Sequence, residues 1–467
     1  MNKLLLVVFL FLAGPLAAQT SPAAINAELD KLLKNPELAQ STVGIMVQDL
    51  DSKEVLIERD ADVLMNPASN TKLVTAAAAL SILGPEHTIF SRVSYDGPRQ
   101  GGAIKGDLWL KSDGDPFLHW DNLVSWAIDL REQGITKIEG KIMVDDLSFA
   151  PGFIPPAFDQ KNEDAAYRAP IGAVSVSYNS VSVYITPSEA GKPANVRMVP
   201  PNDYVEIIND VRTQKGKRVS VSGVATEKDG RTLIRIRGVI GESATGPGVV
   251  RKRIDNPSLF AASAFMHALK STGIEVSGEY GVGARPEGTT TLVLYESAPL
   301  WQHLASMNKW SNNFMAEMIF RQISGSDKAS TEDARAKIDA FLTEVGLTPG
   351  WTAFNGSGLY DGNLFSARQI NQILVHMDTH AFGPEFKMSL PIAGRDGTLK
   401  SRLEGSNTNT RVRGKTGTLN EVTALAGYIT TKSGRRLAYT VIFNKTPVRA
   451  WTLRDEQDAI VSLFVGL

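Results

Sequence analysis

The sequence predicts a mixed α/β (α+β) fold in which a β-rich middle separates two parts that combine helices with antiparallel strands. Hairpin patterns lie near both ends of the chain, at residues 42–58 and 422–443. An alanine-rich run from Lys72 to Leu83 has the composition of a helix. Between these features, short Val- and Ile-rich segments alternate with turns that contain Gly and Pro.

The composition is that of an ordinary globular protein. The chain has 467 residues, of which 43% are hydrophobic and 21% charged, enough for two or three domains. With 49 Lys and Arg against 50 Asp and Glu, the net charge is -1, so no overall basic field exists to hold nucleic acid or an anionic membrane. Cysteine is absent, which excludes disulfides, thiolate metal sites, cysteine nucleophiles and a lipid-modified N-terminal cysteine.

The N-terminus has the layout of a signal peptide over residues 1–18. Lys3 precedes an apolar block from Leu4 to Ala13, and small residues follow at Ala17 and Ala18. The alternative, a buried first helix, does not explain why the positive start and the small-residue exit occur together. Neither this block nor the apolar segment 459–467 reaches the roughly 20 residues of a membrane-spanning helix. We therefore expect an exported protein without a stable membrane anchor.

The first elements are a hairpin and a helix. Strand patterns at Thr42–Asp49 and Val55–Glu58 flank a turn at residues 51–53. The helical run from Lys72 ends at Gly84-Pro85, which places Ser69 at or near the helix start.

The remaining elements follow the same two patterns. In the middle of the chain, strand patterns lie at Val219–Val224 and Thr232–Val239. Two helices are predicted there, at Asp121–Gln133 and Pro257–Lys270. Further helices are predicted at Leu300–Ile323, Thr331–Val345 and Ala367–Met377. The strands of the terminal hairpin are Val422–Thr430 and Leu437–Phe443.

Ser69-Asn70-Thr71-Lys72 is a Ser-x-x-Lys element at the predicted helix start. Residues three apart share a helix face, so the Lys72 amine can reach the Ser69 hydroxyl. A serine hydroxyl needs an adjacent base to act as a nucleophile, and lysine can be that base when burial or a neighbouring cation lowers its pKa. By itself the element is weak, because a second one, Ser306-Met307-Asn308-Lys309, occurs in the same chain.

Two further motifs follow in a fixed order. Ser311-Asn312-Asn313 lies on a helical segment, and Gly414-Lys415-Thr416-Gly417-Thr418 precedes the terminal hairpin. Ser-x-x-Lys, Ser-Asp-Asn and Lys-Thr-Gly in this order are the signature of class A β-lactamases and penicillin-binding proteins. Asn312 stands where the signature has aspartate. We expect little consequence, because the chemistry is assigned to the residues on either side of it.

The second motif suits proton transfer and substrate holding. The Ser311 hydroxyl can pass a proton between Lys72 and a departing amine. The Asn313 amide can hold both Lys72 and the substrate backbone.

The third motif suits recognition of a peptide end. The Lys415 ammonium matches a terminal carboxylate, and the Thr416 hydroxyl adds a donor. Gly417 lets another backbone approach and pair as an added strand. The backbone N–H groups of Thr418 and Ser69 can together form an oxyanion hole.

Two other interpretations of these residues are disfavoured. A phosphate-binding loop needs a glycine five residues before Gly414, and Asn409 stands there. His376 and His380 have the spacing of a helical metal pair, but Met377 replaces the glutamate of a His-Glu-x-x-His site and no third ligand is evident. We therefore expect neither a metal nor a cofactor.

Several stretches beyond the motifs resemble the DacB-type D-alanyl-D-alanine carboxypeptidase/endopeptidases, the class C low-molecular-mass penicillin-binding proteins. They are Gly106-Asp107-Leu108-Trp109-Leu110, Gly114-Asp115-Pro116, Asn355-Gly356-Ser357-Gly358-Leu359, Leu390-Pro391-Ile392-Ala393-Gly394 and Asp396-Gly397-Thr398-Leu399. The resemblance covers nearly the whole chain after the signal peptide. It implies a penicillin-binding-protein/β-lactamase-like transpeptidase fold, an antiparallel sheet with flanking helices, and a periplasmic location.

The resemblance also implies how the chain is divided. Similar proteins carry two extra domains between the first two motifs, which here lie far apart at Ser69 and Ser311. The expected peptidase domain comprises residues 19–92 and 291–467. Inserted domain II comprises residues 93–165 and 250–290, and inserted domain III comprises residues 166–249.

In similar proteins an aspartate of the inserted region meets the amino group of the substrate's diamino acid. The stretch Val144-Asp145-Asp146-Leu147-Ser148-Phe149 resembles that region, with Asp145 as the better match and Asp146 as the alternative.

The activity implied is a serine-type D-Ala-D-Ala carboxypeptidase, with a possible D,D-endopeptidase mode. Its expected partners are peptidoglycan muropeptides ending in D-Ala-D-Ala, β-lactam antibiotics as covalent inhibitors and, as in similar proteins, a second copy in a homodimer. Two alternatives stay open: a β-lactamase with rapid deacylation, and a wall-binding protein with a vestigial site.

Overall fold

The computed structural model describes residues 21–38, 40–405 and 407–467. The predicted signal peptide at residues 1–18 lies outside them. Within the described ranges, no helix is both long and apolar enough to cross a membrane.

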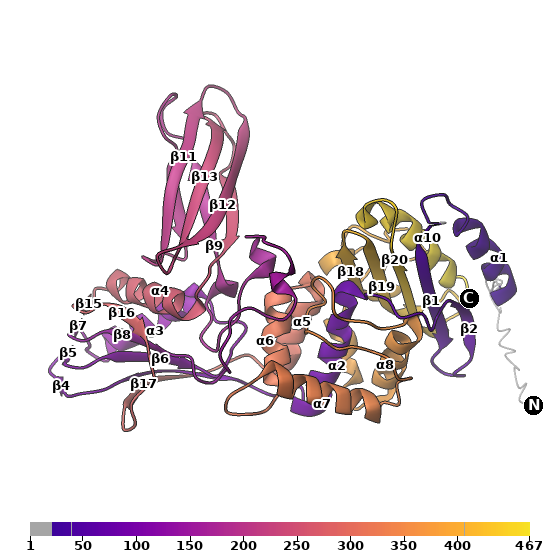
Figure 1. The fold of residues 1–467 in the computed structure, drawn as a ribbon, viewed down its shortest axis with the longest axis horizontal. Helices are drawn as coiled ribbons and strands as arrows, with labels where there is room; N and C mark the ends of the chain where they lie inside the picture. Colours follow the sequence, from indigo (N-terminus) through magenta and orange to yellow (C-terminus); the bar gives the residue numbers. More distant parts are fainter. Residues whose placement is uncertain (1–20, 39, 406) are drawn as a thin grey trace, which may run out of the picture.

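A five-stranded antiparallel sheet forms the centre of one half of the molecule (Figure 1). Its order is β18-β19-β20-β1-β2. The strands are β1 (Thr42–Asp49), β2 (Val55–Arg59), β18 (Val412–Leu419), β19 (Val422–Thr430) and β20 (Arg436–Asn444). Both predicted hairpins are therefore present, and pairing of β1 with β20 joins them into one sheet. The order leaves β18, which carries the third motif, at an edge.

Helices cover both faces of this sheet. On one face, α8 (Ala367–Thr379) contacts the strands directly, and α2 (Thr71–Leu83), α5 (Leu300–Trp310), α6 (Asn313–Gln322), α7 (Thr331–Glu344) and α9 (Gly383–Ser389) share the same hydrophobic core. The other packs against α1 (Pro22–Leu32) and α10 (Arg454–Phe464). Alternate residues of β19 supply the two cores, since Ala424 and Ala426 face the first and Leu425 faces the second.

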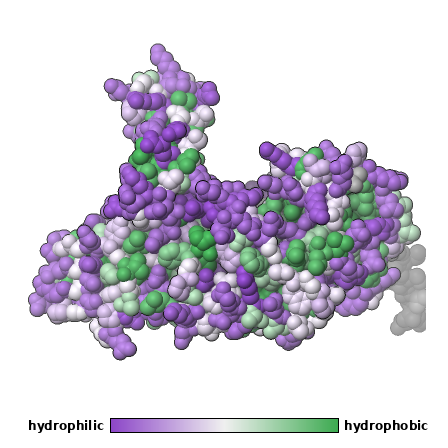
Figure 2. All heavy atoms as spheres, in the orientation of Figure 1, coloured by the Kyte–Doolittle hydropathy of each residue, from purple (hydrophilic) through white to green (hydrophobic). Residues whose placement is uncertain are grey.

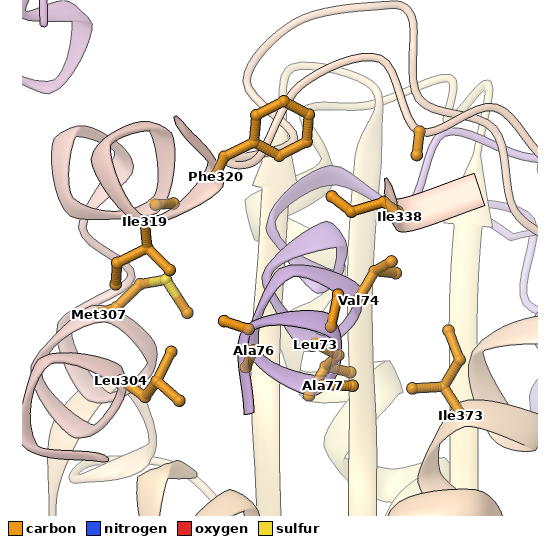
Figure 3. Close-up of a cluster of buried hydrophobic side chains, with 14 of the residues drawn as sticks. Leu73, Val74, Ala76, Ala77, Leu304, Met307, Ile319, Phe320, Ile338 and Ile373 are labelled. Atoms are coloured by element: carbon orange, nitrogen blue, oxygen red, sulfur yellow. The ribbon is translucent and has the colours of Figure 1, made fainter. Parts of the chain in front are cut away.

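Helix α2 lies at the centre of the larger core. Figure 3 shows Ala76 and Ala77 of α2 beside larger side chains of the surrounding helices, among them Leu304 and Met307 of α5. Residues 71–80 of α2 are all buried. A helix with hydrophobic or small side chains on every face is surrounded by other elements, and its alanines allow those elements to approach closely. The alanine run therefore holds Ser69 and Lys72 on a rigid support.

The inserted region begins and ends with paired strands. β3 (Phe90–Tyr95) pairs with β17 (Thr290–Glu296) in a five-stranded sheet of order β16-β8-β6-β3-β17. Its other strands are β6 (Leu108–Ser112), β8 (Ile142–Asp145) and β16 (Tyr280–Val282). A smaller sheet of order β15-β7-β5-β4 consists of β4 (Arg99–Gln100), β5 (Ala103–Ile104), β7 (Lys137–Ile138) and β15 (Glu275–Val276). Helices α3 (Trp120–Glu132) and α4 (Pro257–Ser271) share a hydrophobic core with these strands.

A second part of the insertion projects from the body as an arm (Figure 1). One of its sheets has the order β10-β9-β14, formed by β9 (Ser180–Thr186), β10 (Asn195–Val199) and β14 (Gly248–Arg253). The other has the order β11-β13-β12, formed by β11 (Val205–Gln214), β12 (Val219–Lys228) and β13 (Arg231–Gly241). Polar side chains cover the outer end of the arm (Figure 2).

Residues 156–168, here called the strap, connect the inserted region to the peptidase half expected from the resemblance, the one built on the sheet β18-β19-β20-β1-β2. The Asn355 amide donates to the Pro156 carbonyl at 3.0 Å, and Gln160 exchanges two hydrogen bonds with the backbone of Asp361. On the other side, Asp164 forms an ion pair with Lys252 of β14 at 2.6 Å. The strap therefore contacts the peptidase half and the arm at once.

The structure refines the predicted elements at particular points. The helix expected at Leu300–Ile323 is two helices, α5 and α6, which meet at Ser311. The domain limits remain a prediction. Because β3 and β17 belong to the inserted sheet, the strand pairing favours crossing points near residues 89 and 297, a few residues outside those limits.

Candidate active site

Ser69 lies in a tight turn before α2. It is the middle residue of a short 3-10 helix, η1 (Ala68–Asn70), and Ala68 has a positive φ of 46°. A Cβ at Gly417 of β18 would lie 2.9 Å from the Pro67 carbonyl and 3.1 Å from the Ser69 nitrogen. Gly417 is thus required because the backbone of β18 approaches the Ser69 turn directly.

Lys72 is completely buried beside Ser69. Its Nζ lies 3.0 Å from Ser69 Oγ, 2.8 Å from Asn313 Oδ1 and 2.7 Å from the Ser357 carbonyl. Burial lowers the pKa of Lys72 to about 7, and the charge of Glu317 partly opposes that shift. Near neutral pH, a large fraction of Lys72 is therefore the uncharged amine.

Glu317 is a buried carboxyl that the sequence analysis missed. It projects from α6 and accepts hydrogen bonds from the backbone N–H groups of Gly356 and Ser357 at 3.2 and 2.8 Å. Burial raises its pKa. Glu317 fixes the loop that presents the Ser357 carbonyl to Lys72. No short motif marks this residue, because its partners are brought to it only by the fold.

The second motif occupies the junction of α5 and α6. Ser311 ends α5 in the left-handed conformation, with φ of 55°. The Asn312 side chain caps α6 by accepting from the Met315 N–H at 3.1 Å. Asparagine and aspartate are comparable helix caps, which explains why the departure from the signature is tolerated. Asn313 begins α6 and donates from its amide nitrogen to the Tyr167 carbonyl of the strap at 3.1 Å.

The third motif lies along edge strand β18. Lys415 is fully buried, and its Nζ donates to Ser311 Oγ at 2.8 Å and to the Thr416 carbonyl at 2.7 Å. Burial and the nearby Lys72 lower the pKa of Lys415 well below its usual value. The Thr416 hydroxyl donates to Thr398 Oγ at 2.8 Å. The three motifs therefore meet at one place.

A cleft of about 350 Å³ opens over these residues. Ser69, Ser311, Asn313 and Thr418 line it. The lining also includes Gly358 and Leu359 of the family-like stretch 355–359. The rest are residues that the sequence patterns did not mark: Lys161, Glu163 and Tyr167 of the strap, Tyr360, Leu419, Asn420 and Trp451. The inserted region thus forms one wall of the cleft.

Asp145 and Asp146 do not line this cleft. Asp145 is buried at the end of β8, where it lies 3.5 Å from Lys111 Nζ and accepts from the backbone N–H of Leu147. Asp146 accepts from the Ser258 hydroxyl at the start of α4. Both therefore connect parts of the inserted region.

The carboxylate that lines the cleft is Glu163. It accepts hydrogen bonds from the phenolic hydroxyls of Tyr360, at 2.8 Å, and of Tyr167. These bonds lower the pKa of Glu163, so it is ionised at neutral pH.

The second Ser-x-x-Lys element and the pair His376 and His380 form contacts away from the cleft. Lys309 of the second Ser-x-x-Lys element forms an ion pair with Asp396 at 2.7 Å. His376 and His380 line a separate hollow, where His380 Nδ1 accepts from the Phe382 N–H at 3.1 Å. Within the described ranges, no group of three or more His, Cys, Asp or Glu residues is placed to hold a metal ion.

The sequence profile of the D-Ala-D-Ala carboxypeptidase 3 (S13) family matches residues 25–465. A D-alanyl-D-alanine carboxypeptidase of Actinomadura sp. (strain R39) is 31% identical over 94% of this chain and 85% of its own length. The D-alanyl-D-alanine carboxypeptidase DacB of Haemophilus influenzae is 24% identical over 90% of this chain and 88% of its own length.

Solved structures show the same fold. Penicillin binding protein 4 (dacB) from Haemophilus influenzae superposes with a TM-score of 0.79 at 21% identity, covering 94% of this chain and 99% of the other. The same protein in complex with a β-lactam gives a TM-score of 0.73, at 22% identity and 94% and 97% coverage. These superpositions confirm the predicted penicillin-binding-protein-like α/β fold.

Proposed function

Because the chain belongs to the D-Ala-D-Ala carboxypeptidase 3 (S13) family and is a serine-type D-alanyl-D-alanine carboxypeptidase, we propose that Ser69 is the residue acylated by its substrate. The observation that carries this proposal is the contact of 3.0 Å between Ser69 Oγ and the buried Lys72 amine. The enzyme acts on peptidoglycan stem peptides that end in D-Ala-D-Ala.

Lys72 is the general base in this mechanism. A neutral amine that donates to Asn313 Oδ1 and the Ser357 carbonyl has used both of its N–H groups. Its lone pair is then free to accept the Ser69 proton. As Ser69 Oγ attacks the carbonyl of the penultimate D-alanine, that proton moves to Lys72 Nζ.

The backbone N–H groups of Ser69 and Thr418 stabilise the oxyanion of the tetrahedral intermediate. The close approach of Gly417 to the Ser69 turn supports this assignment, because it fixes the two backbones relative to each other. Asn313 donates its amide to the substrate backbone once the Tyr167 carbonyl yields that position.

Ser311 completes the proton path. Its hydroxyl accepts from Lys415 at 2.8 Å and lines the cleft beside Ser69. A proton passes from Lys72 through the Ser311 hydroxyl to the nitrogen of the terminal D-alanine as the peptide bond breaks. Lys415 and Thr416 bind the terminal carboxylate. Water then attacks the acyl-enzyme, with Lys72 again taking the proton, and the shortened peptide leaves Ser69.

Glu163 is proposed for the task that the sequence analysis gave to Asp145. It is a carboxylate in the cleft wall, ionised at neutral pH, and suits the amino group of a diamino acid in the stem peptide. Asp145 has partners within the inserted region instead.

Labelling with a fluorescent penicillin tests whether Ser69 is the nucleophile. A β-lactam imitates the D-Ala-D-Ala end and should acylate Ser69, so Ser69→Ala should abolish covalent labelling. Ser306→Ala, which alters the second Ser-x-x-Lys element, is the matched control and should label like the wild type. Labelling that persists in Ser69→Ala would overturn the assignment.

Mass spectrometry of muropeptides separates the remaining activities. Loss of one D-alanine from a pentapeptide is the carboxypeptidase outcome, and cleavage of cross-linked dimers would add the endopeptidase mode. A β-lactamase would instead hydrolyse nitrocefin rapidly and release no D-alanine. The signal-peptide layout supports export to the periplasm, where fractionation of the producing cell should find the activity.

A further inference from the structure

A second hollow, of about 470 Å³, adjoins the active-site cleft at the turn between β18 and β19. Asn420 and Trp451 line both the hollow and the cleft, so the two are neighbours. Glu421, Arg449 and the segment 446–448 form its other walls. A volume of this size lies within the range of small-molecule binding sites.

Trp451 presents an uncovered aromatic surface to this hollow. It lies in the short 3-10 helix η6 (Ala450–Leu453), and 52% of its surface is exposed. An indole exposes a large flat apolar face together with an N–H donor.

Polar side chains surround this aromatic face. Asn420, Glu421 and Arg449 are exposed and line the hollow. They offer an amide, a carboxylate and a guanidinium. A pyranose ring has C–H groups on its faces and hydroxyl or acetamide groups around its edge, so a flat apolar face bordered by such groups matches it in chemistry.

The direction of the proposed substrate path leads to this hollow. With the terminal carboxylate at Lys415 and the scissile carbonyl at Thr418, the rest of the stem peptide continues toward Asn420. Segment 391–393 pairs with edge strand β18 at residues 412–414, which leaves the edge beyond Gly414 for an antiparallel peptide. The four residues of the stem peptide that remain on this side of the scissile bond, extended at about 3.3 Å each, reach about 13 Å beyond Thr418. The end of the stem peptide that is attached to sugar therefore lies on the Trp451 side.

We propose that the hollow beside Trp451 is a subsite for the sugar ring that carries the stem peptide, with the ring stacked on the indole. This inference rests on the proposed function, because it uses the direction of the peptide along β18. With this subsite, the enzyme binds both the peptide and the sugar of its substrate.

The experiment compares two substrates with the same pentapeptide, one free and one attached to its disaccharide. For wild type, kcat/KM should be about tenfold higher with the disaccharide, the gain expected of one good aromatic stacking contact. Trp451→Leu keeps an apolar side chain but removes the flat face, so the ratio should fall to near one. Trp451→Phe keeps an aromatic face and should retain most of the preference.

Far-UV circular dichroism and thermal unfolding serve as folding controls. Both Trp451 variants should match the wild type in each. A wild-type ratio near one, or a Trp451→Leu ratio equal to that of wild type, overturns the sugar subsite and leaves the proposed function intact. Absence of D-alanine release from both substrates with wild type would instead overturn the proposed function itself.

Discussion

At the scale of single residues, the active site depends on two buried groups of opposite sign. Burial alone would make Lys72 a neutral amine at physiological pH, and Glu317 restrains that shift. The balance holds the pKa of Lys72 at about 7, which suits a base that must accept a proton and then return it.

The first prediction concerns the pH dependence of acylation. In the proposed mechanism only the neutral form of Lys72 accepts the Ser69 proton, so the acylation rate should be half its plateau near pH 7 and fall as the pH is lowered. Glu317→Gln removes the charge that raises the Lys72 pKa, so this acidic limb should move to lower pH. Rapid-quench labelling with a penicillin from pH 5 to 9 measures it. Glu332→Gln, at an exposed position, is the control. An acidic limb that lies at the same pH in Glu317→Gln as in wild type contradicts the prediction.

A second titrating residue lies outside the active site, where the two halves of the molecule meet. Asp115 is 1% exposed, and its Oδ1 accepts from the Phe117 N–H at 2.8 Å and lies 4.0 Å from His303 Nε2. Burial raises the pKa of Asp115 to about 6 and lowers that of His303 to about 4. His303 is therefore neutral wherever Asp115 titrates.

The second prediction follows from the sign of this shift. Because the pKa of Asp115 is raised in the folded state, its favourable contribution is complete below pH 4 and is lost as the pH rises through about 6. Asp115→Asn keeps the oxygen that accepts from Phe117 and cannot ionise. Relative to wild type, its free energy of unfolding should improve by about 1–2 kcal/mol between pH 5 and pH 8. Urea unfolding at both pH values checks this, and an unchanged difference would contradict it.

At the scale of elements, the site depends on how closely β18 approaches the start of α2. The third prediction is that Gly417→Ala slows acylation at least about a hundredfold, because misplaced reacting groups are costly. The added Cβ would meet the Pro67 carbonyl and the Ser69 nitrogen, so β18 must move away. Stopped-flow acylation measures the rate, and circular dichroism should show a retained fold.

Gly281→Ala is the matched control for this substitution. Gly281 lies in β16 of the inserted region, where a Cβ would meet only the flexible Met143 side chain, at 3.3 Å. Acylation should be unchanged. Equal rates in Gly417→Ala and wild type would show that the close approach has no role in positioning Ser69.

Local patterns predicted the elements well wherever sequence neighbours determine the structure. Strands β1 and β19 have the predicted limits, and the alanine run became α2. The break between α5 and α6 escaped prediction, because Ser311 adopts a left-handed conformation that its residue type does not favour. The surrounding contacts hold it there, including the bond from Lys415.

At the scale of the whole molecule, the strap brings the inserted region to the active site. Glu163 and Tyr167 come from the strap, and Trp451 follows the last strand, yet all three line one cleft. No spacing in the sequence relates these residues to Ser69. The three motifs could be found because they form a known ordered set. Their neighbours could not, because only tertiary packing brings them together.

The fourth prediction tests this connection. Asp164 anchors the strap to the arm through Lys252 and the Ala225 N–H, at 2.6 and 2.7 Å. Asp164→Ala leaves both groups without this partner, which costs about 1–3 kcal/mol locally. Hydrogen exchange at residues 161–168 should accelerate, and acylation should slow severalfold because Glu163 and Tyr167 of the strap, which line the cleft, are held less firmly.

Asp210→Ala provides the comparison for the strap. Asp210 forms an exposed ion pair with Arg235 on β11 and β13 of the arm, away from the strap. Its removal should alter neither exchange at residues 161–168 nor acylation. If Asp164→Ala and Asp210→Ala have the same exchange and acylation rates, anchoring of the strap to the arm has no effect on the active site.

The pairing of β1 with β20 also has a consequence for how the protein matures. Thr42 of β1 pairs with Asn444 of β20, so the first strand of the sheet waits for one of the last to be synthesised. Contacts this distant in sequence form late and slowly. Ser69 and Lys72 therefore emerge early from the ribosome, but Ser311 and Lys415 can join them only when most of the chain is present. The nascent enzyme stays inactive until its synthesis is nearly complete.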